Sequence, residues 1–167
     1  LRDDRSGHLH PLNYTLGLAA AAAAAGATIY EQAMVVGIEH GSTVRVRTAA
    51  GPSVRARHVA LCCNAFIDEK ISKALRDRIM PVGTYIIATE RLGQARIESL
   101  LRENVAVSDV NFVLDYFRRS DDHRLLFGGR VSYSGIDARD TGRATGARMR
   151  RVFPQLADVR LDYVWGG

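Results

Sequence analysis

The sequence predicts an α/β to α+β fold, with a layered sheet early in the chain and a second sheet with helices on one side after it. Three observations support this. An alanine-rich helix at residues 10–25 runs into a short strand, as in parallel layered sheets. Residues 59–63 form an apolar run typical of a central strand covered on both faces. The charged stretch 67–78 marks a boundary before the second sheet.

The elements of the first part follow from local patterns. The helix begins with Pro11 in its first turn and stops at Gly26. Arginine and valine alternate in two runs around a Gly-Pro turn, which predicts a hairpin. Strands are expected at residues 28–31, 33–39, 43–48, 53–58 and 59–63. Cys62 and Cys63 are neighbours on the last of these, so we expect two buried core side chains, without a disulfide or a metal.

The second part reads as strands and amphipathic helices in alternation. Thr141 is the expected N-cap of the last helix, and apolar residues alternate along the final strand. Helices are expected at residues 68–78, 92–103 and 141–153, and strands at 80–90, 112–118, 124–131 and 158–165. The polar turn 119–123 joins two of the strands into a hairpin.

Composition bounds the function. The chain has 167 residues, is 47% hydrophobic and has no apolar run long enough for a bilayer, so we expect a soluble protein with no membrane partner. The two neighbouring cysteines, interpreted as unpaired core residues, indicate a reducing cytoplasm. The net charge of +5 comes mainly from arginine, because Lys70 and Lys73 are the only lysines. These arginines alternate with apolar residues, which favours a solvated sheet face over nucleic-acid binding. His8 and His10 supply too few ligands for zinc, so we interpret them as the entry to an element.

Two regions are candidates for ligand binding. Tyrosines and arginines lie near Gly128 and Gly129 in the sequence, and together they can hold a carboxylate. The alternative is that the arginines line a solvent-exposed strand face and that the tyrosines are strand residues without a binding role. This cluster consists of Tyr116, Arg118, Arg124, Arg130 and Tyr133. At the end of the chain, Trp165 is followed by Gly166 and Gly167. The tryptophan can pack against a flat cofactor, or it can fill part of the hydrophobic core.

Five segments carry a resemblance to a known family. They are GHLHPLNYTLGLAAAAAAAGATIYE, ARHVALCCNAF, MPVGTYIIATE, DYFRRSDDHRLLFGGRVSY and VFPQLADVRLDYVWGG. In this order they resemble the central part of FAD-dependent oxidoreductases of the glycine and D-amino-acid oxidase family, including its amine oxidases. The resemblance implies that residues 1–66 are part of a Rossmann-like FAD-binding domain. It also implies that residues 67–167 form a substrate domain with a mixed β-sheet.

The resemblance implies roles for individual residues. The backbone of Val35 and Val36 would lie near the adenine, Asn64 and Ala65 near the dinucleotide, and Trp165 and Gly166 near the isoalloxazine ring. The residues expected to position the substrate are Tyr85, Tyr116, Arg118, Arg130 and Tyr133. No residue is assigned as a catalytic base, because the flavin carries the chemistry.

The implied activity is oxidation of the C–N bond of an amine or amino acid, with hydride transfer to FAD and release of H2O2. The family's glycine-rich pyrophosphate segment and its carboxyl-terminal segment are missing from these residues, so we expect a central fragment that is inactive alone. It would bind FAD weakly or not at all, and it could self-associate. The alternative is an arginine-rich module that binds an acidic small ligand without redox chemistry.

Overall fold

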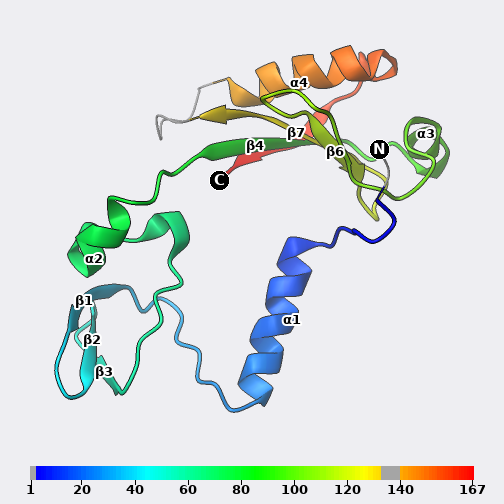
Figure 1. The fold of residues 1–167 in the computed structure, drawn as a ribbon. Coiled ribbons are helices and arrows are strands. Elements are labelled where there is room, and N and C mark those ends of the chain that lie inside the picture. The colour runs from blue at the N-terminus through cyan, green and yellow to red at the C-terminus, as the bar shows by residue number, and fades with distance from the viewer. Residues whose placement is uncertain (1–2, 133–139) are drawn as a thin grey trace. The chain divides into compact units, whose positions relative to one another are not determined.

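The structure, a computed structural model, describes residues 3–132 and 140–167, and the side chain of Arg130 lies outside this description. The chain divides into two compact units. One unit is His10–Met80, and the other is Leu1–Leu9 together with Pro81–Gly167. Each unit has its own sheet, and Figure 1 labels most of the helices and strands of both.

The unit His10–Met80 contains one long helix and a small antiparallel sheet with strand order β1-β2-β3. The helix starts at His10, whose Nδ1 accepts a hydrogen bond from the backbone N–H of Asn13 at 3.3 Å. It ends just before Gly26, which has a φ of 94°. The elements are α1 Pro11–Ala24, β1 Val35–Glu39, β2 Val44–Thr48, β3 Ser53–Ala56, the 3-10 turn η1 Asn64–Phe66 and α2 Glu69–Arg76.

Two strands expected in this unit are not formed. Residues 28–31 and 59–63 have irregular backbone, and Cys62 and Cys63 are exposed, so the prediction of two buried cysteines was wrong. The physical reason is that a central strand needs hydrogen-bonded neighbours on both edges, and no described strand pairs with 59–63. The Rossmann-like layer therefore stays a prediction.

The second unit is built on a five-stranded sheet with the order β5-β6-β7-β4-β8. Its elements are β4 Gly83–Thr89, α3 Gln94–Leu100, β5 Val107–Ser108, β6 Tyr116–Arg119, β7 Leu125–Ser132, α4 Thr141–Val152, the 3-10 turn η2 Pro154–Leu156 and β8 Leu161–Gly166. Every described strand pair in this sheet is antiparallel, so the prediction of a mixed sheet was wrong. The short β6–β7 turn imposes antiparallel neighbours, and β8 runs back along β4 after α4. The expected N-cap also shifts by one residue, from Thr141 to Asp140.

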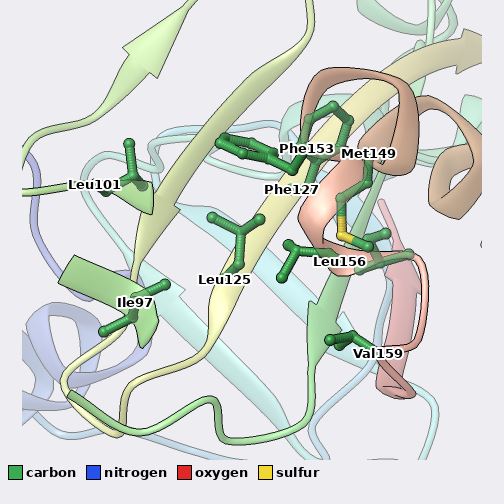
Figure 2. Close-up of a cluster of buried hydrophobic side chains, with 9 residues drawn as sticks. Ile97, Leu101, Leu125, Phe127, Met149, Phe153, Leu156 and Val159 are labelled. Atoms are coloured by element: carbon green, nitrogen blue, oxygen red, sulfur yellow. The ribbon is translucent and has the colours of Figure 1, made fainter. Parts of the chain in front are cut away.

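One face of this sheet carries the core. Helix α4 packs against β4, β7 and β8 on this face, as Figure 1 shows. Phe117 stacks on Phe127 with a ring-centroid distance of 5.8 Å and meets the edge of Phe153 at 4.9 Å. Figure 2 shows the buried cluster, which consists of Ile87, Ile97, Leu101, Leu125, Phe127, Met149, Phe153, Leu156 and Val159. This apolar cluster gives the unit a core of its own.

The opposite face of the same sheet is not covered by any described helix of this unit, and we call it the open face. Successive strand residues point to opposite faces, so the residues that neighbour the core positions must belong to it. The strand register places its members in two rows. The first row is Tyr116, Gly128, Ile86 and Trp165, and the second is Arg118, Leu126, Ala88 and Tyr163.

Candidate functional site on the open sheet face

The open face brings together Tyr116, Arg118 and Trp165, which are among the residues that the sequence singled out. Tyr116 and Arg118 are two positions apart on β6, so their side chains share this face with Cα atoms about 6.8 Å apart. Trp165 lies three strands away in the same row as Tyr116, about 14 Å across the sheet, and 44% of it is exposed. A tyrosine, an arginine and a tryptophan therefore surround one apolar stretch of sheet.

Gly128 explains how the Tyr116 side chain lies. A Cβ atom at position 128 would fall within 3.0 Å of the ring and of the hydroxyl oxygen of Tyr116. The phenol ring therefore lies flat over the backbone of β7 and carries its hydroxyl toward the middle of the open face. A glycine in a strand commonly marks such a close approach.

Gly129, the next residue, serves the other face. A Cβ atom there would lie 2.9 Å from Oδ1 of Asp115 and 3.2 Å from the carbonyl oxygen of Leu114. Asp115 is almost fully buried, and its carboxylate accepts hydrogen bonds from Nε and Nη2 of Arg148 on α4 at 2.7 and 2.8 Å. The same contact raises the pKa of Arg148. Gly128 thus leaves room for the Tyr116 ring on one face of the sheet, and Gly129 leaves room for the ion pair of Asp115 and Arg148 on the other.

We predict that Gly128→Ala lowers the free energy of unfolding by about 1–3 kcal/mol, because the new methyl group overlaps the Tyr116 ring. Urea denaturation followed by circular dichroism measures this change. Gly7→Ala is the matched control, because a Cβ at position 7 meets nothing within 4 Å. Equal stability of the two variants would contradict the flat placement of Tyr116.

Arg118 and Arg124 differ in what they contact. Arg124 donates to the carboxylates of Asp122 and Asp162 at 2.8 and 2.6 Å and to the Thr89 carbonyl at 2.7 Å, so it is a structural residue. Among the described residues, Arg118 pairs with no carboxylate, and its Nη1 lies 3.4 Å from Nδ1 of His8. Of these two arginines, only Arg118 keeps its charge available for a ligand.

The ion pairs around Arg124 make stability depend on pH. The pKa of Asp122 falls from 3.8 to about 2, mainly because the Ser120 hydroxyl donates to Oδ1 at 2.6 Å, with further help from Arg124 and Arg91. Because this pKa is lowered on folding, the stabilisation is present above pH 3.8 and is lost as the pH falls toward about 2. We predict that Asp122→Asn flattens the pH dependence of unfolding in this window. Acid titrations at fixed urea would measure it, and parallel curves for the two proteins would contradict it.

The other candidate substrate residues lie elsewhere. Tyr85 is on the core face of β4, 6% exposed, and a Cβ at Gly166 would lie 2.5 Å from its ring. The structure therefore places Tyr85 on the opposite face from Tyr116 and Arg118, and Gly166 makes room for it. The backbone of Arg130 belongs to β7 while its side chain lies outside the described residues, and Tyr133 lies outside them altogether.

The candidate FAD-binding residues fall in both units. Val35 opens β1, an edge strand of the small sheet, and Val36 sits at an irregularity in its pairing with β2. Asn64 starts the 3-10 turn with a φ of 49°, and Ala65 follows it. Trp165 and Gly166 are on β8 of the second unit. Each pair therefore stands at a strand edge, a turn or a strand end.

Comparisons with known proteins identify the family. The sequence profile of the family described as FAD dependent oxidoreductase (DAO) matches residues 1–167. The chain belongs to this family. Gamma-glutamylputrescine oxidoreductase of Escherichia coli (strain K12) is 41% identical over 167 residues, which is 100% of this chain and 39% of the relative. A probable oxidoreductase, OrdL, of Haemophilus influenzae (strain ATCC 51907 / DSM 11121 / KW20 / Rd) is 43% identical over 171 residues, or 38% of its length.

The fold also matches a solved structure. The crystal structure of L-proline dehydrogenase from P. horikoshii superposes with a TM-score of 0.72 at 17% identity, covering 94% of this chain and 42% of that one. At this identity the match shows the fold alone. The chain spans about two fifths of the length of the curated relatives. No helix among the described residues is long and apolar enough to span a membrane.

Proposed function

We propose that the full-length protein is an FAD-dependent oxidase of a carboxylated amine or amino acid, such as gamma-glutamylputrescine. The observation that carries this proposal is the open face, where Arg118 has no carboxylate partner among the described residues and shares the face with Tyr116. The 41% identical relative is named for the same substrate.

The side chains on the open face suit the carboxylate end of such a substrate. The Arg118 guanidinium can donate two parallel hydrogen bonds to a carboxylate, and the Tyr116 hydroxyl can donate a third. This would fix the position of the amine carbon relative to Trp165 across the sheet. Arg130 and Tyr133 stay proposed substrate residues, and Tyr85, on the other face, would act through packing.

The described residues fit a flat cofactor. Trp165 is part-exposed beside Ile86, so the row ends in an uncovered apolar surface that a planar ring can cover. Val35, Val36, Asn64 and Ala65 would hold the adenine and dinucleotide portions, and Trp165 and Gly166 would approach the ring. When bound, FAD accepts the hydride equivalent from the carbon beside the amine, and oxygen would then be reduced to H2O2.

The first test is the anaerobic visible spectrum of the full-length protein before and after addition of gamma-glutamylputrescine. A flavin spectrum that bleaches is the expected result. A flavin spectrum that does not bleach would remove this substrate, and a folded protein without flavin would remove the proposed function.

A further inference from the structure

His8 contacts Arg118 of the candidate site, although the two residues are 110 positions apart in the sequence. It belongs to the second unit, ahead of α1, and is half-buried. Its Nε2 is 3.1 Å from the carbonyl oxygen of Asn104, in the loop after α3. Its Nδ1 is 3.4 Å from Nη1 of Arg118. The imidazole therefore bridges a fixed backbone group and the available guanidinium.

The chemistry of the two partners defines the state of the ring. A carbonyl oxygen can only accept a hydrogen bond, so Nε2 must carry the hydrogen. A guanidinium can only donate, so Nδ1 must be the acceptor. Only the neutral ring with its hydrogen on Nε2 satisfies both partners. In this state the ring orients one N–H of Arg118 and leaves the other donors of the guanidinium for a ligand.

We propose that His8 is a positioning residue for Arg118. By holding the Arg118 guanidinium in place, His8 raises the affinity of Arg118 for the carboxylate of the substrate. This inference rests on the proposed function, in which Arg118 binds that carboxylate. A guanidinium side chain has many rotamers, and holding it in one of them reduces the entropy lost on binding. His8 acts through Arg118 and does not contact the substrate itself.

Two substitutions separate this role from simple anchoring of the chain. In His8→Asn the amide oxygen can stand near the Nδ1 position and accept from Arg118, while the link to Asn104 is lost. In His8→Gln the amide nitrogen can stand near the Nε2 position and donate to Asn104, while the acceptor for Arg118 is lost. Positioning predicts that Asn is the better replacement, and anchoring predicts that Gln is.

The measurement uses the full-length flavoprotein, with flavin content and melting temperature recorded for each variant. We expect His8→Gln to raise the KM for gamma-glutamylputrescine about fivefold to tenfold, with kcat within about twofold. Putrescine has the same terminal amine and no carboxylate, so the kcat/KM ratio of the two amines should fall about as much. Calorimetric titration with glutarate, a dicarboxylate without an amine, gives the affinity independently of turnover. His10→Gln is the matched control, because the side-chain hydrogen bond described for His10 is the N-cap of α1.

The outcomes distinguish the inference from the function. If Arg118→Ala raises the KM and His8→Gln does not, the positioning role of His8 is overturned and the proposed function stands. If Arg118→Ala also leaves the KM and the glutarate affinity unchanged, the carboxylate site itself is wrong. In the Arg118→Ala background, His8→Gln should have no further effect, and an additive effect would show a merely structural role.

Discussion

Replacement of Arg118 by alanine is expected to raise the KM for gamma-glutamylputrescine about 30-fold to 140-fold while kcat changes little. The variant loses charge-assisted hydrogen bonds worth about 2–3 kcal/mol, and each 1.4 kcal/mol is about tenfold in affinity. The carboxylate is remote from the reacting carbon, so this binding energy is the same in the ground and transition states. Steady-state kinetics of the full-length flavoprotein would measure the effect.

Arg119 is the matched control for this experiment. It is the next residue on β6, points to the core face and lies 3.5 Å from Glu98. Arg119→Ala should leave the KM within about twofold, because exposed or part-exposed pairs contribute only about 0–1 kcal/mol to stability and none to this binding. Equal effects at positions 118 and 119 would show that general positive charge, and not the open face, binds the substrate.

Replacement of Phe127 by alanine is expected to cost about 3–5 kcal/mol of unfolding free energy. Phe127 is 0% exposed and stacks on Phe117, so the truncation leaves a cavity in the middle of the core between the sheet and α4. A loss of this size is a large part of the total free energy of unfolding of a typical domain. Urea denaturation of the purified chain would measure it.

Phe112 offers the same substitution without the cavity, because it is 95% exposed. Phe112→Ala should change the unfolding free energy by about 0.5 kcal/mol or less. A loss below about 1 kcal/mol for Phe127→Ala would mean that the cluster in Figure 2 does not stabilise this unit.

The resemblance in the sequence found the family, and local patterns found most elements. The hairpin of β6 and β7, the helices α1 and α4 and the strands β4 and β8 were all expected within a few residues. They have strong local signals, namely alternation, capping residues and turn residues. The segment 59–63 failed because its apolar composition predicts burial, which only paired neighbouring strands can provide.

The candidate site shows the same division. Tyrosine and arginine side chains that can hold a carboxylate were visible in the sequence, but their alternation along a strand does not say which face is covered. Packing of α4 put Tyr85 on the core face, and the ion pairs with Asp122 and Asp162 made Arg124 structural. His8 was visible only as half of an HxH pattern, and nothing local links it to a residue on β6.

By itself the sequence determined the family, most of the helices and strands, and the tyrosine and arginine residues that can hold a carboxylate, because these depend on short-range patterns and on motifs. The tertiary structure decided which side chains meet. The strand register decided which residues share the open face, and Gly128 allowed the Tyr116 ring to lie flat over β7. Contacts between residues as far apart as His8 and Arg118 depend on how the whole unit packs, and no local pattern encodes that.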